Sequence, residues 1–172
     1  AESGDWITPW FEPGVPFWGK PPLSFWVQAL SIRLFGLDEW AVRFPSLLAF
    51  LAILAVIHTV ARRYAGLRAA FWAVIVYASC ALPYIAGIAV LTDPFLALGT
   101  TLCMAGFVLG QWYWRALGFV GLAIGLLAKG PLAGVLVVGS IATGWLICRQ
   151  CQWSRISGKS WLCGIALVIA LV

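Results

Sequence analysis

The chain has 172 residues, of which 63% are hydrophobic and 10% are charged, and its mean hydropathy is +0.98. A soluble domain has roughly 25% charged residues, so this composition excludes an ordinary soluble domain and predicts a membrane protein. The net charge of +5 does not indicate a nucleic-acid partner, because the basic residues are spread between apolar runs rather than gathered into one patch.

Residues 1–40 are predicted to form a periplasmic loop with an interfacial helix. Residues 1–22 are polar, aromatic and rich in proline, which is typical of a loop. In residues 23–36 the apolar residues recur at helical spacing, but the segment is too short and too mixed to span a bilayer, so we expect a helix that lies at the interface. Residues 37–40 are predicted to form a turn.

Residues 41–172 are predicted to form the transmembrane region of an all-α, polytopic membrane protein with about six membrane segments. A helix needs roughly 20 apolar residues to cross a bilayer, and Pro83 is expected to kink the second apolar run. The chain begins without Met and ends inside an apolar run, so we expect it to be a piece of a longer protein. The runs lie near 42–61, 69–88, 94–110, 112–128, 131–148 and 161–172.

The distribution of charge predicts how these segments are oriented. Three connections between the runs carry Arg or Lys but no acid, and short basic connections stay in the cytoplasm. Their basic residues are Arg62, Arg63, Arg68, Arg115, Arg149, Arg155 and Lys159. The opposite, periplasmic side is then predicted to hold all six acids and the other four bases, which are Lys20, Arg33, Arg43 and Lys129. We therefore expect any chemistry to lie on the outer side.

Lys20 is a candidate for chemistry because it stands in the segment PFWGKPPLSFW, among aromatic residues and prolines. Pro21 and Pro22 fix their own backbone angles, and Pro21 pushes Lys20 to an extended conformation. A compact ammonium group at a membrane surface suits a phosphate head group. The alternative is an interfacial lysine that reaches into water, with the prolines starting a helix.

Three further charged residues on the predicted outer side are candidates. Asp93 lies in VLTDPFLA, where it is either part of a helix cap or a carboxylate that faces an outer cavity. Lys129 lies in LLAKGPLAG, where Gly130 and Pro131 break the helix, and it is either a charged turn residue or a second cation over the same cavity. Arg43, in AVRFPS, leaves the same two alternatives.

Residues that commonly bind metals are not grouped in this sequence. His58 is isolated in an apolar run, which favours a packed histidine. Cys148 and Cys151 have C-x-x-C spacing, but no second pair and no nearby His accompanies them, so this spacing is only a weak indication of a metal or redox site. The sequence therefore predicts no metal site and no disulfide framework.

Six short segments, in this order, resemble the bacterial lipid-linked sugar transferases, which are the dolichyl-phosphate-mannose protein mannosyltransferase-like proteins and include the aminoarabinose transferase of lipid A. No single segment is decisive, but the shared order is specific, and the resemblance covers nearly the whole chain. The segments are ESGDWITPW at 2–10, KPPLSFW at 20–26, LFG at 34–36, VRFPS at 42–46, LTDPF at 91–95 and AKGP at 128–131.

The resemblance implies an inverting GT-C membrane glycosyltransferase of the bacterial inner membrane, with its active site facing the periplasm. Such enzymes move a sugar from a polyprenyl-phosphate carrier to a lipid, protein or glycan acceptor. The family's Lys-Pro matches Lys20-Pro21 and its helix-start Asp matches Asp93, which implies catalytic roles for Lys20 and Asp93. Lys20, together with Lys129 or Arg43, is then expected to bind the lipid phosphate.

Two departures from the family pattern shape this expectation. The family's Asp-Glu pair, usually assigned as the base, lies upstream of the segment that matches SGDW, so this stretch alone is expected to lack activity. Members of the aminoarabinose branch have a Glu just before the Lys, and that Glu can join a metal site. Here Gly19 takes its place, so a bound divalent metal is doubtful and no cofactor is predicted.

The alternative is a non-enzymatic piece of a transporter or channel. Paired charges inside the membrane and broken helices are typical of such proteins. In this sequence the middles of the runs hold almost no ionisable residue, and mixed charge collects on one side. This distribution favours the transferase. The oligomeric state is not predicted.

Overall fold

The structure is a computed structural model that describes residues 10–12, 15–16, 21–147 and 158–172. It is built almost entirely of helices, as predicted, with two short antiparallel strands that the sequence did not predict. The described elements are β1 (Trp10–Glu12), β2 (Val15–Pro16), α1 (Leu23–Phe35), α2 (Glu39–Ser79), α3 (Ala81–Ile88), α4 (Asp93–Leu109), α5 (Trp112–Lys129), α6 (Pro131–Ile147) and α7 (Gly158–Leu171).

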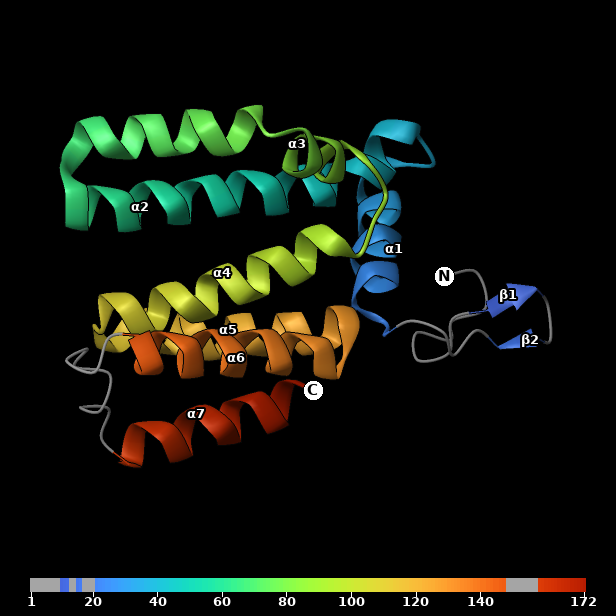
Figure 1. Cartoon of the computed structure of the whole chain (residues 1–172). Coiled ribbons are helices and arrows are strands. Elements are labelled where there is room, and N and C mark those ends of the chain that lie inside the picture. The colour runs from blue at the N-terminus through green and yellow to red at the C-terminus, as the bar shows by residue number, and fades with distance from the viewer. Residues whose placement is uncertain (1–9, 13–14, 17–20, 148–157) are drawn as a thin grey trace.

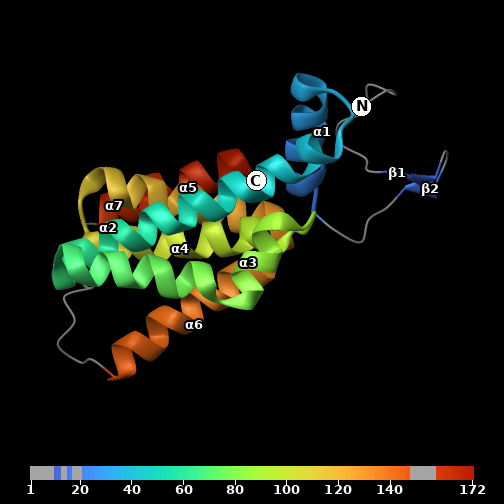
Figure 2. The same cartoon turned by 90° about the horizontal axis from the view of Figure 1, so that it is seen from above.

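The long helices form an antiparallel bundle, and α1 crosses one end of it (Figures 1 and 2). α2 folds back on itself at Gly66, whose φ of 83° lies in the left-handed region that glycine adopts without strain. The first arm of α2 corresponds to the first predicted run, and the second arm together with α3 covers the second predicted run. The predicted turn at 37–40 is shorter than expected, because Glu39 already begins α2.

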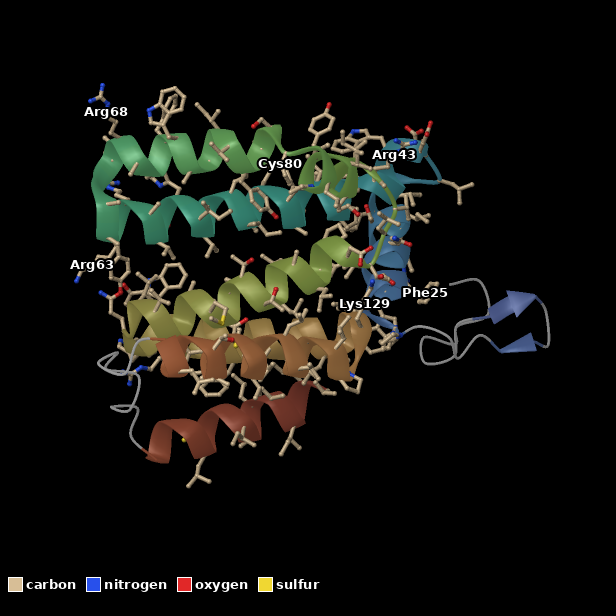
Figure 3. The ribbon with its side chains drawn as sticks, in the orientation of Figure 1. Phe25, Arg43, Arg63, Arg68, Cys80 and Lys129 are labelled. Atoms are coloured by element: carbon tan, nitrogen blue, oxygen red, sulfur yellow. The ribbon has the colours of Figure 1, made fainter. Side chains whose placement is uncertain are left out.

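Charged residues separate to the two ends of the bundle (Figure 3). Arg43 and Lys129 lie at the end that α1 crosses, which we call the α1 end. Arg63 and Arg68 lie at the opposite end, which we call the arginine end. This separation is the one expected if the bundle spans a membrane with its basic connections on one side.

The second predicted run, near residues 69–88, was expected to be kinked by Pro83, but in the structure it is broken into two helices. α2 ends at Ser79, Cys80 has the extended backbone angles φ −67° and ψ 130°, and α3 begins at Ala81. Pro83 lies in the first turn of α3 and has no N–H to donate to the Ser79 carbonyl, so a continuous helix would lack a hydrogen bond at this point.

α4 and α5 pack backbone against backbone through glycines. A Cβ atom added to Gly99 would lie 2.5 Å from the Gly121 carbonyl oxygen and 2.6 Å from the Gly125 nitrogen. A Cβ atom on Gly106 would lie 2.5 Å from the Trp114 carbonyl oxygen. Only glycine permits this approach, which fixes the two helices in register and brings the start of α4 to the end of α5.

Length and composition indicate how many described helices are able to cross a membrane. α2 meets both criteria. α3 and α4, which meet at an angle of 117°, meet them only as a bent pair. Among the described residues the structure thus gives one such helix, or two with the bent pair, and the predicted six membrane segments remain a prediction.

Candidate functional site

Asp93 and Lys129 form an ion pair at the α1 end of the bundle. Asp93 is the first residue of α4 and Lys129 is the last residue of α5. The antiparallel packing of these two helices places the two side chains side by side. One of the two alternatives for Lys129 places it over the same outer cavity as Asp93, and the structure pairs the two side chains directly.

Local sequence explains why both residues stand at helix ends. Thr92 precedes α4 and Pro94 follows Asp93 in its first turn, where proline's missing N–H costs nothing. Gly130 ends α5 with a φ of 61°, and its N–H donates to the Leu126 carbonyl oxygen over 2.6 Å. The Asp93 carboxylate pairs with Lys129, and no side chain provides a capping hydrogen bond at the start of α4.

Helix dipoles favour both charges of this pair. A carboxylate is stabilised at a helix N-terminus and an ammonium at a helix C-terminus, and Asp93 and Lys129 occupy these positions. The pair is nonetheless open to its surroundings, because the side chain of Asp93 is 50% exposed and that of Lys129 is 35% exposed. Exposed pairs contribute only about 0–1 kcal/mol to stability, so both groups stay available to a ligand at little cost.

The start of α1 docks beside this pair. Ala49, Phe95 and Ala128 form a buried cluster, and Leu23 and Val27 of α1 pack against it. Phe95 lies two residues after Asp93, and Ala128 directly precedes Lys129. The segment that leads into α1 through Pro21 and Pro22 therefore arrives next to the ion pair.

Buried hydroxyl groups lie in the elements of the α1 end, and the sequence analysis did not single out the two serines among them. Ser31 of α1 is 4% exposed, and its Oγ donates to the Ala41 carbonyl oxygen of α2. Ser46 is fully buried, and its Oγ has no hydrogen-bond partner among the described residues. Thr92 is 8% exposed. For the two serines, the available signal was a small polar residue at a helix position whose neighbours in the sequence are apolar.

Arg43 lies at the α1 end but pairs elsewhere. Its guanidinium forms an ion pair with Glu39, one turn earlier in α2. The neighbouring Phe44 makes an edge-to-face contact with Phe35, at the end of α1, with ring centroids 5.2 Å apart. Lys129 lies instead by the start of α1 (Figure 3). The length of α1, about 20 Å for its 13 residues, thus separates Arg43 from the Asp93–Lys129 pair.

Lys20 and the candidate metal ligands are the remaining features that the sequence singled out. Lys20 and the Gly19 that precedes it lie outside the described residues, as do Cys148 and Cys151. Among the residues that the structure describes, no three His, Cys, Asp or Glu side chains are grouped as metal ligands. The residues of the site are thus the charged pair Asp93 and Lys129, the neighbouring Thr92 and the apolar cluster beside them.

The fold matches that of two solved structures of one protein, ArnT from Cupriavidus metallidurans. ArnT from Cupriavidus metallidurans in the apo state superposes with a TM-score of 0.89 over 99% of this chain and 33% of that chain, at 24% identity. ArnT from the same organism bound to undecaprenyl phosphate superposes with a TM-score of 0.88 over the same shares. These matches confirm the predicted GT-C-type helical fold.

Sequence relatives identify the family. The family model described as dolichyl-phosphate-mannose-protein mannosyltransferase matches residues 19–172, and the chain belongs to this family. The undecaprenyl phosphate-alpha-4-amino-4-deoxy-L-arabinose arabinosyl transferase of Edwardsiella ictaluri is 34% identical over 90% of this chain. A second such transferase, from Sodalis glossinidius, is 32% identical over the same share. The chain spans 29% of the length of each of these relatives.

Proposed function

We propose that this chain forms the donor-binding part of a multi-pass glycosyltransferase of the bacterial inner membrane, which transfers a sugar from a polyprenyl-phosphate carrier on the periplasmic side. The observation that carries the proposal is the exposed Asp93–Lys129 ion pair at the α1 end, beside the start of α1, which Pro21 and Pro22 lead into. Family membership supports the reaction class, and the first donor to test is the undecaprenyl-phosphate aminoarabinose named for the relatives.

The chemistry requires a cation and a base. An acceptor hydroxyl attacks the anomeric carbon, the bond from that carbon to the phosphate oxygen breaks, and the polyprenyl phosphate leaves with one additional negative charge. Fixed cations at that oxygen lower the energy of the transition state. Lys20 supplies the first cation and Lys129 the second, while Arg43 is a more distant cation.

Asp93 has a double role in this scheme. Its carboxylate pairs with Lys129 and so sets the position of that ammonium beside the donor. It also lies where a carboxylate is able to orient the sugar or accept the proton of the acceptor hydroxyl, together with the family's upstream base. No step of the scheme requires a metal.

The test measures sugar transfer from the polyprenyl-phosphate donor by the protein in its full natural length. Lys20→Met keeps much of the apolar stem and removes the charge, so we expect a loss of roughly 10²–10³ in rate. Lys20→Arg keeps the charge but replaces a compact ammonium with a planar fork, so partial activity is expected. The matched control is Arg33→Met in α1, which removes a cation from an exposed position away from the ion pair.

Protein amounts in the membrane are matched before rates are compared. Turnover near the wild-type value in Lys20→Met would contradict the role of phosphate binding and leave Lys20 as an interfacial lysine. An equal loss in Arg33→Met would show that the rate follows the total positive charge of residues 1–40 rather than the position of Lys20.

A further inference from the structure

A pocket lies between α5 and α7, away from the Asp93–Lys129 pair, and the Arg115 side chain lines it. Its volume is about 330 Å³, and it opens to the surface of the described bundle. α5 contributes Trp112, Arg115 and Phe119, and α7 contributes Cys163 and Leu167. The pocket is lined mainly by apolar side chains, and among the residues that the structure describes Arg115 is the one charged residue in its lining.

This pocket belongs to the arginine end of the bundle. Arg115 stands in the first turn of α5, which begins two residues after Gly110, the residue that ends α4. The hydroxyl group of Tyr64 donates to the carbonyl oxygen of Val108 over 2.7 Å, which ties the end of α4 to the turn of α2. The Asp93–Lys129 pair occupies the opposite ends of the same two helices, so the pocket is separate from the proposed donor site.

Arg115 is poorly satisfied within the described part of the chain. Its Nε is buried and has no hydrogen-bond partner there, and Arg115 forms no ion pair with any described acid. A guanidinium group has five N–H donors, and leaving buried donors unpaired is costly. An anion that entered the pocket would meet the Arg115 guanidinium, which lines it.

The arrangement of the walls selects the kind of anion. Trp112, Arg115 and Phe119 follow one another at helical spacing along one face of α5, so the pocket begins at an exposed Trp and continues past the cation to an apolar wall. Trp112 is 80% exposed, as is typical of a residue at a membrane interface. Such a pocket offers a phosphate contact at its mouth and an apolar surface deeper in.

We propose that the pocket between α5 and α7 binds an anionic phospholipid of the cytoplasmic leaflet, with its phosphate on Arg115 and an acyl chain along Phe119 and Leu167. Basic pockets between membrane helices on the cytoplasmic side bind anionic head groups in this way. The larger groove between α2, α4 and α6, of about 560 Å³, has no charged residue among the described residues that line it, so these residues offer no ionic contact for a head group. The lipid would hold α7 against α5.

Native mass spectrometry of the protein in its full natural length tests the proposal, with phosphatidylglycerol, phosphatidylcholine or glycerol 3-phosphate added in separate titrations. The wild-type protein should retain phosphatidylglycerol more strongly than phosphatidylcholine. Glycerol 3-phosphate should not bind detectably, because it has no acyl chain. Equal retention of the two lipids, or binding of glycerol 3-phosphate as tight as that of phosphatidylglycerol, would overturn the proposal.

Two variants and a matched control complete the test. Arg115→Gln should weaken phosphatidylglycerol binding by about fivefold or more, since one arginine near an anionic lipid contributes about 1 kcal/mol. Arg68→Gln removes the same charge at the same end but outside the pocket, and it should bind the lipid as the wild type does. Equal losses of phosphatidylglycerol binding in both variants would indicate that the lipid is attracted to the basic end of the bundle in general. That result would overturn the proposed site at Arg115.

Leu167→Trp covers the case in which Arg115→Gln does not fold. Leu167 is 37% exposed, so a larger side chain fills the pocket from its edge while Arg115 remains. This variant should also lose the lipid, and unchanged binding would overturn the proposal. Asp93→Asn should bind phosphatidylglycerol normally even where sugar transfer is lost, which separates this inference from the proposed function.

Discussion

Asp93 and Lys129 face each other across the joined ends of α4 and α5, each at the helix end whose dipole favours its charge. A purely structural pair and a catalytic pair predict different results when the two charges are exchanged. The double variant Asp93→Lys/Lys129→Asp keeps an ion pair but places both charges against the helix dipoles. We expect sugar transfer to fall by roughly 10² or more, because the carboxylate no longer lies where it orients the sugar or takes a proton.

Stability serves as the control for this exchange. Exposed ion pairs and helix-end charges each contribute up to about 1 kcal/mol, so the double variant should lose only a few degrees in Tm. The single variant Asp93→Asn should keep normal stability and lose transfer. Transfer at the wild-type rate in the exchanged variant would assign the pair a structural role only.

The close contact of α4 and α5 leads to a prediction about stability. Gly99→Ala places a Cβ atom 2.5 Å from the Gly121 carbonyl oxygen, so the helices must separate, and overpacking of this kind costs about 1–3 kcal/mol. Gly134→Ala in α6 is the matched control, because a Cβ atom there meets nothing within 4 Å. Alanine is the better helix former, so this control should be neutral or slightly stabilising. Thermal unfolding in detergent measures the Tm of both variants. Equal Tm values for Gly99→Ala and Gly134→Ala would contradict the close packing of α4 against α5.

Sequence reasoning located the helices well, because runs of apolar residues and glycine or proline breaks are local signals. Gly110 and Gly130, for example, end α4 and α5 close to where the apolar runs stop. The same reasoning could not give the back-folding of α2 in detail, since the left-handed backbone of Gly66 depends on how the two arms pack. The strands β1 and β2 were missed because two or three residues carry too little pattern to recognise.

A shared outer position for Asp93 and Lys129 was a hypothesis that the sequence allowed, but their direct ion pair was not predictable. Proline and glycine neighbours marked Asp93 and Lys129 as helix-end charges, and a family resemblance added a function. Their pairing depends on the register of α4 against α5, which glycine contacts set and which no linear pattern reveals. Arg43 looked equivalent to Lys129 in the sequence, yet it pairs with Glu39 at the other end of α1.

Ser31 is predicted to position α1 and, with it, the segment that carries Lys20. Its buried hydroxyl donates to the Ala41 carbonyl oxygen, which joins α1 to α2. Ser31→Ala removes that bond and leaves a buried carbonyl oxygen without this partner, at a cost of about 1–3 kcal/mol. If α1 positions the donor-binding segment, the KM for the polyprenyl-phosphate donor should rise severalfold.

A matched serine separates this effect from a general loss of hydroxyl groups. Ser140→Ala in α6 removes an exposed hydroxyl that bonds only to the Leu136 carbonyl oxygen of its own helix. We expect this variant to keep both its stability and its KM. A normal KM in Ser31→Ala, despite lower stability, would show that α1 does not position the donor.

The orientation of the bundle leads to the last prediction, which compares two exposed apolar residues at opposite ends. Trp40 lies in the first turn of α2 near Arg43 and is 56% exposed, while Leu67 follows the Gly66 turn near Arg68 and is 63% exposed. Basic connections stay in the cytoplasm, so the α1 end should face the periplasm. In a background without the five native cysteines, a membrane-impermeant maleimide added to spheroplasts should label Trp40→Cys. It should reach Leu67→Cys only after the membrane is opened.

Labelling of Leu67→Cys but not of Trp40→Cys in intact spheroplasts would place the Asp93–Lys129 site in the cytoplasm, where a periplasmic acceptor cannot reach it. Labelling of both variants before the membrane is opened would contradict the assumption that the bundle spans the bilayer.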